Sequence, residues 1–162
     1  MKLLKQIFDF YLNSSIHVAL SCYALVRITF HVFHIPYDEA MALFVFFGTI
    51  VGYNFVKYDA LVRVKKKPIR FQLKIIAVFS FISVILCGYY FLQLARITQI
   101  VSFGIFAVTA LYTLPFFPNR RNARNWAGVK IYIVAICWVG ATLVLPLINA
   151  GVGLTSDFFI KS

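Results

Sequence analysis

Residues 75–92 read IIAVFSFISVILCGYYFL, an apolar stretch without a charged side chain. A helix needs roughly 20 apolar residues to cross the ~30 Å hydrocarbon core of a bilayer. Lys74 precedes the stretch directly, and Arg96 follows it closely. The stretch therefore predicts a transmembrane helix with a basic residue near each end.

Similar stretches recur along the chain, which has 162 residues and is 62% apolar. A soluble domain is roughly half apolar, and spanning chains of this pattern satisfy their backbone hydrogen bonds as helices. We therefore expect an all-α, polytopic transmembrane helical bundle of about five spans. The expected spans are 16–33, 40–56, 75–92, 97–116 and 129–148, the fourth ending at Pro115 and Pro118 because proline cannot continue a helix.

The whole chain, 1–162, is expected to form a single transmembrane domain. Residues 1–13 would hold a short interfacial helix, at about 3–12, and Ser14 or Ser15 would cap the first span. The five spans would occupy 16–148. The tail, 149–162, is too short to span.

Positive charge is concentrated in the segments 57–74 and 120–130, and the net charge is +11. Threading five spans in order places both segments and the amino terminus on one side. Lys and Arg mark the cytoplasmic side of membrane proteins. We therefore expect a cytoplasmic amino terminus and an integral membrane protein (of the inner or plasma membrane in a bacterium). This pattern also explains the charge without a nucleic-acid partner.

Two sequences lie at the predicted cytoplasmic ends of the second and fourth spans. Residues 52–63 read GYNFVKYDALVR, and residues 111–121 read LYTLPFFPNRR, followed by NWAGVK at 125–130. In their order along the chain and in their position on the predicted cytoplasmic side, these elements resemble those of the UbiA-type intramembrane prenyltransferase superfamily. The resemblance covers about 16–148, which corresponds to the amino-terminal half of such a protein.

This resemblance implies transfer of a prenyl group from a polyprenyl diphosphate to an aromatic or lipid acceptor, with Mg²⁺ held by two aspartate motifs. Carried onto this chain, it implies diphosphate contacts but no catalytic residue. Asp59 would be the candidate Mg²⁺ ligand. The implied contacts are Asn54, Asp59, Arg120, Arg121 and Lys130.

The chain departs from the family pattern at the first aspartate motif. With Asn54 on the family's asparagine, Phe55, Tyr58 and Val62 occupy the aspartate positions. Asp59 is turned about 140° from Asn54 around a helix. The second motif would follow a sixth span, beyond this chain. Whether the protein is an enzyme is therefore left open.

The alternative is a non-catalytic membrane protein that binds an isoprenoid or another lipid, or a structural one. Its partners would be the lipid bilayer and either a second copy of the chain or a missing carboxy-terminal half. Asn54 would then hydrogen-bond between helices, and Asp59 would pair with Arg63 on the helix surface. Arg27, within the first span, would face the bundle interior or reach an interface.

Overall fold

The computed structural model describes residues 2–64, 71–113 and 128–151, which form helices joined by short turns and connections. Apart from the end of α3, the helices start and end within about four residues of the positions expected from the sequence. In chain order the elements are α1 (Lys2–Asn13), α2 (Ile16–Val32), α3 (Glu39–Val64), α4 (Phe71–Gln93), α5 (Arg96–Thr113), α6 (Val129–Val139), the π-helical η2 (Gly140–Val144) and α7 (Leu145–Asn149).

One helix is much longer than its predicted span. α3 continues to Val64, eight residues past the predicted end at Val56. Residues 57–64 contain neither glycine nor proline, so nothing in the local sequence stops the helix. The backbones of Asp59 and Arg63 therefore lie on α3.

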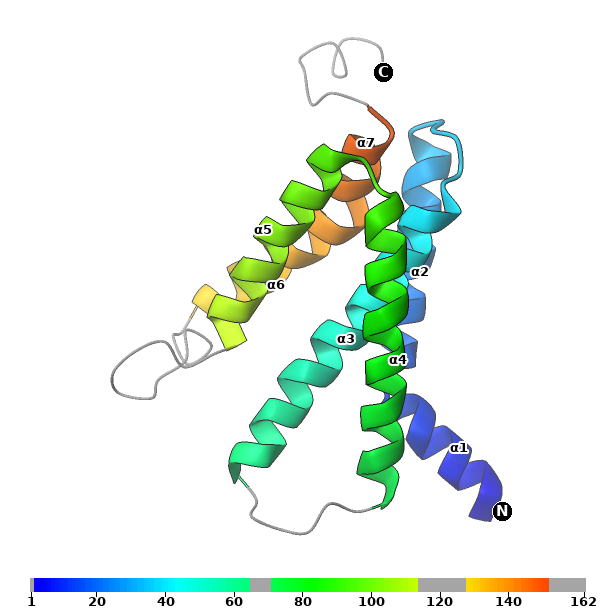
Figure 1. The fold of residues 1–162 in the computed structure, drawn as a ribbon, viewed down its shortest axis with the longest axis vertical. Helices are drawn as coiled ribbons and strands as arrows, with labels where there is room; N and C mark the ends of the chain where they lie inside the picture. Colours follow the sequence, from blue (N-terminus) through cyan, green and yellow to red (C-terminus); the bar gives the residue numbers. More distant parts are fainter. Residues whose placement is uncertain (1, 65–70, 114–127, 152–162) are drawn as a thin grey trace.

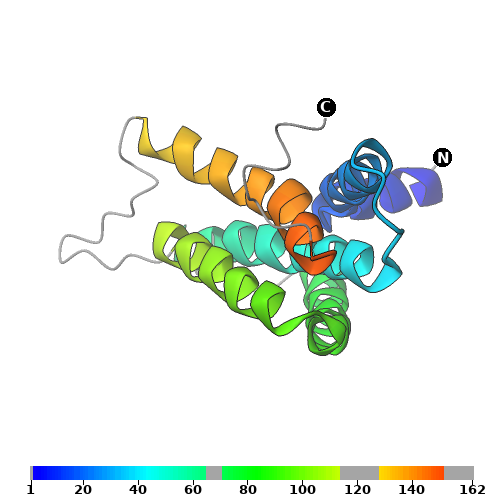
Figure 2. The same cartoon turned by 90° about the horizontal axis from the view of Figure 1, so that it is seen from above.

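The helices alternate in direction along the bundle (Figure 1). α1 and α4 begin at one end, and α3 ends there; we call this the basic end, because α3 carries the start of the basic segment 57–74 to it. α5 runs toward the same end but stops short of it, where α6 begins. The connection 33–38, the turn 94–95 and the end of α7 lie at the opposite end. Seen from above, α5 and α6 lie on one side of the bundle and α1 lies on the other (Figure 2).

The buried core lies toward the opposite end, where α2, the start of α3 and α7 meet. Its side chains are apolar, and none is more than 5% exposed. The cluster comprises Cys22, Val26, Phe30, Met41, Ala42, Val45, Leu94 and Leu145.

The outward faces of the helices are apolar. α5 buries the hydroxyl residues Thr98 and Ser102 and exposes a row of large apolar side chains, the reverse of a soluble helix. This arrangement is typical of a helix surrounded by lipid, because polar side chains there lie in the contacts between helices. The row is Ile97, Ile100, Phe103 and Phe106.

Three helical stretches are long and apolar enough to cross a membrane. They are Glu39–Tyr58, Lys74–Gln93 and Ile131–Asn149. α1 and α2 together would provide a fourth if they formed one bent span, with an angle of 57° between them. Arg96–Thr109, in α5, is a shorter apolar helix. The described residues thus support a polytopic helical membrane protein with three to four candidate spans, compared with the five expected.

A hydrogen-bonded chain ties the connections together at the opposite end. Asp38 accepts the backbone N–H of Met41 (3.2 Å) and so caps the start of α3. Its other carboxylate oxygen accepts Asn149 Nδ2 at 2.6 Å, and Asn149 Oδ1 accepts the N–H of Ala95 at 3.0 Å. Asp38 and Asn149 therefore join the connection 33–38, the turn 94–95 and α7.

Candidate functional site

The five residues carried over by resemblance do not all fall within the described structure. Asn54 is fully described, in α3. Asp59 lies on α3 and Lys130 near the start of α6, but their side chains lie outside the described residues, as do Arg120 and Arg121 entirely. A common site formed by all five therefore stays a prediction.

Asn54 links three helices through its side chain. It is 2% exposed. Its Oδ1 accepts a hydrogen bond from Ser15 Oγ at 3.0 Å, and its Nδ2 donates to Ser80 Oγ at 2.8 Å. This is the interhelical arrangement that polar side chains adopt inside membranes, so one oxygen and one N–H of the amide are already bonded within the protein.

Ser15 occupies the predicted capping position but does not cap α2 with its side chain. Its backbone is left-handed (φ 62°), and it turns the chain between α1 and α2. The Ser15 hydroxyl points to Asn54 instead. Neither Ser15 nor Ser80 could be found as a partner of Asn54 from spacing, because their contacts join distant parts of the chain.

The end of α1 is anchored to α3 by a member of the basic segment. Lys57 Nζ donates to the carbonyl oxygen of Asn13 (3.2 Å) and to its Oδ1 (3.3 Å). The Tyr58 hydroxyl donates to the same carbonyl at 3.3 Å. A cation at a helix carboxyl end is favourable, because it satisfies unpaired carbonyls and complements the helix dipole. Lys57 thus holds α1 against the bundle.

A groove lies between α1 and α4 at the basic end. The ring centroids of Phe10 and Phe79 are 5.8 Å apart in an edge-to-face contact. The groove has a volume of about 450 Å³, and its single charged lining residue is Lys74, in the first turns of α4. Its lining residues are Phe10, Lys74, Ile75, Val78, Phe79 and Ile82. The lining surface of the groove is therefore almost entirely apolar, and Lys74 is the one charged residue that contributes to it.

The described residues do not form a metal site. Mg²⁺ requires several hard oxygen ligands in octahedral geometry. Within the described ranges, no group of three His, Cys, Asp or Glu side chains is placed to hold a metal ion. Asn54, the one expected polar contact that is described, has its amide oxygen bonded to Ser15. The side chain of Asp59, the candidate ligand, lies outside the described residues, so Mg²⁺ binding stays a prediction.

Comparison with protein-family models, curated proteins and solved structures finds no match to this chain.

Proposed function

We propose that this protein binds a membrane amphiphile with an apolar chain and a phosphate or diphosphate headgroup. The hydrocarbon would occupy the groove between α1 and α4, and the phosphate would be held by Lys74. The observation that carries this proposal is the combination of about 450 Å³ of mainly apolar groove with a lysine in its lining. Isoprenoid diphosphates and anionic phospholipids share this chemistry.

The size and charge of the groove support such a ligand. Small-molecule sites commonly have volumes of roughly 300–1,000 Å³, with mainly apolar walls and few polar groups. A lysine near the membrane surface attracts anionic headgroups by about 1 kcal/mol. The amphipathic α1 exposes Leu3, Leu4, Ile7 and Phe8, as expected of a helix lying at the membrane surface.

The arrangement of Asn54 favours binding over metal-dependent transfer. A ligand could reach its oxygen only by opening the packing around Ser15 and Ser80, because the Asn54 side chain is 2% exposed. An unpaired buried polar group costs about 1–3 kcal/mol. Asn54 therefore serves the helix packing in this proposal.

Prenyl transfer is the second candidate. The observation in its favour is that α3 and α5 both run toward the basic end (Figure 1). The two sequences that resemble the prenyltransferases adjoin these helix ends. Such an enzyme would transfer a prenyl group from a polyprenyl diphosphate with the help of Mg²⁺, and Asp59 would be its candidate ligand.

The test measures binding of geranylgeranyl diphosphate and of phosphatidylglycerol to the purified full chain in mild detergent, by native mass spectrometry. Lys74→Gln should weaken binding of both by about fivefold, the loss of roughly 1 kcal/mol of headgroup attraction. Lys5→Gln is the matched control, because Lys5 is exposed on α1 and does not line the groove.

A second pair of variants tests the apolar part of the groove. Val78→Trp should block the ligand chain, whereas Val84→Trp, on an exposed part of α4 outside the groove, should not. Equal effects of both tryptophans would overturn the proposal. Binding that disappears when EDTA is added, together with prenyl transfer abolished by Asp59→Asn, would establish the second candidate instead.

A further inference from the structure

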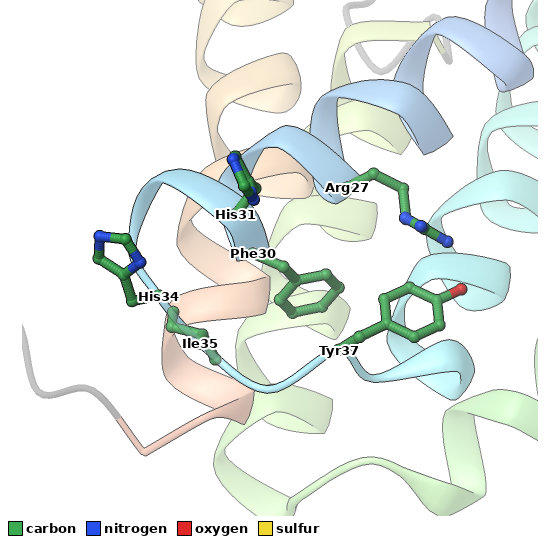
Figure 3. Close-up of a pocket in the computed structure, with 6 residues that line it drawn as sticks. All are labelled: Arg27, Phe30, His31, His34, Ile35 and Tyr37. Carbon is green, nitrogen blue, oxygen red and sulfur yellow. The ribbon is translucent and has the colours of Figure 1, made fainter.

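A second basic cluster lies at the opposite end of the bundle. Arg27, His31 and His34 line one hollow of about 280 Å³ at the end of α2, together with Phe30, Ile35 and Tyr37 (Figure 3). The positive-inside rule accounts for Lys and Arg at the basic end. It does not account for basic residues at the other end, so this cluster needs a different explanation.

The backbone that carries the cluster is a well-formed helix terminus. The N–H of Ile35 donates to the Phe30 carbonyl (3.0 Å), and the N–H of His34 donates to the His31 carbonyl (3.3 Å). These two bonds define a Schellman motif. Its left-handed position, usually glycine, is His34, with φ 52°. The motif projects His34 away from the helix axis (Figure 3).

Arg27 reaches the connection 33–38 rather than the bundle interior. Its Cζ lies 4.3 Å from the centroid of the Tyr37 ring, and its guanidinium extends over that ring in Figure 3. The Tyr37 and Tyr23 hydroxyls are hydrogen-bonded at 3.0 Å. Partial burial, followed by the bond to Tyr23, raises the pKa of Tyr37, so its phenol stays protonated at neutral pH.

The hollow has an excess of hydrogen-bond donors and positive charge. Of the described residues that line it, none is a carboxylate. Phe30 and Tyr37 support it from below through an edge-to-face contact with centroids 5.7 Å apart. The Arg27 guanidinium is hydrogen-bonded to the Tyr23 and Tyr37 hydroxyls. These two partners do not use all five of its N–H donors, and the others can bind phosphate oxygens. The complementary ligand is therefore an anion with several oxygens.

The surface next to the hollow is apolar. Leu25, Ile28 and Val32 are exposed on α2 over the same two turns that carry Arg27 and His31. A ligand that covers both surfaces has an anionic head and a hydrocarbon tail. We propose that this hollow binds the phosphate of a phospholipid in the leaflet opposite the basic segments, with its acyl chain along α2.

The experiment uses the full chain carrying Lys74→Gln, so that binding at the basic end does not obscure the result. Phosphatidylglycerol binding is measured by native mass spectrometry at fixed neutral pH. Arg27→Gln should weaken it about tenfold, because a charge-assisted hydrogen bond to the phosphate is lost. Arg27→Lys should retain part of the affinity, since it keeps the charge without the planar fork.

Arg96→Gln is the matched control. Arg96 is an exposed arginine at the same end, at the start of α5, and does not line the hollow. Its replacement should leave binding within about twofold of the starting value, the size expected from exposed charge alone. Equal losses for Arg27→Gln and Arg96→Gln, or no loss for Arg27→Gln, would overturn the proposal. Displacement of the lipid by excess inorganic phosphate would overturn the lipid assignment in favour of a free anion.

Discussion

The hydroxyl of Thr29 donates a hydrogen bond of 2.9 Å to the backbone carbonyl of Thr142. Pro146, four residues after Thr142, has no N–H, so the usual helical partner of this carbonyl is missing. The Thr29 hydroxyl on α2 thereby provides a donor where residue 146 of α7 has no N–H. Thr142 itself lies in the π-helical η2, and π-helical turns of this kind occur as local widenings within α-helices.

Replacement of Thr29 by valine should lower the free energy of unfolding by about 1 kcal/mol, because the Thr142 carbonyl loses its donor in a buried place. Unfolding by denaturing detergent, followed by circular dichroism, measures the change. Thr142→Val is the matched control, since the Thr142 hydroxyl bonds to the Trp138 carbonyl within the same helical stretch. Its effect should be smaller.

A double-mutant cycle separates the Thr29 bond from a simple packing change. In a Pro146→Ala background, residue 146 regains an N–H that can bond to the Thr142 carbonyl. Thr29→Val should then cost less than in the original chain. An equal cost in both backgrounds would contradict this explanation.

Gly140 allows close contact between η2 and α5. A Cβ added at Gly140 would lie 2.7 Å from Ile105 Cδ1 and 3.3 Å from its Cγ1. Gly140→Ala should therefore be about 1 kcal/mol less stable than Gly104→Ala, because overpacking against Ile105 offsets the helix propensity that alanine gains. Ile105→Val should remove this difference. Gly104→Ala is the control, because nothing lies within 4 Å of its added Cβ. Equal stability of the two alanine variants in the same unfolding assay would exclude an effect of this contact.

His34 occupies a left-handed backbone position (φ 52°) that suits glycine. His34→Gly should raise the free energy of unfolding by about 1 kcal/mol, the usual cost of this conformation for a residue with a Cβ. His31→Gly provides the comparison, because His31 is helical; it should destabilise by about 1 kcal/mol. A loss of stability in both variants would contradict the role assigned to the backbone of His34.

Asn54→Ala should destabilise the protein by about 2 kcal/mol, because two interhelical hydrogen bonds are lost. Ser15→Ala removes one of them. Since the two residues share a bond, the double variant should cost less than the sum of the single variants. Additive losses in thermal unfolding would show that the Ser15–Asn54 bond is not important for stability.

The charge pattern predicts that the basic end faces the cytoplasm. In a chain with its three cysteines replaced, a cysteine at Ala95 should react with a membrane-impermeant maleimide on intact cells. A cysteine at Gln6, near the amino terminus, should react only after the membrane is opened. Labelling with the reverse preference would overturn the predicted orientation.

The helices were predictable because their signals are local. The uncharged run 75–92 corresponds to α4 (Phe71–Gln93), and α5 ends at Thr113, two residues before Pro115. Local signals could not reveal that Ser15 would bond to Asn54 instead of capping α2. That choice depends on residues 39 positions apart. Of the candidate site, the sequence indicated that Asn54 was important but not which of its two possible roles it has.

By itself, the sequence determines an apolar helical chain with its positive charge concentrated beside alternate helix ends. The reason is physical. In apolar runs of this length the backbone N–H and C=O groups must hydrogen-bond to each other, which they do in a helix. The charge of each loop follows directly from its Lys and Arg residues. Only the tertiary structure decides which polar atoms meet. Asn54 with Ser15 and Ser80, Thr29 with Thr142, and Arg27 with Tyr37 are pairings across space. They form only after helix packing brings their side chains within reach, which no local pattern specifies.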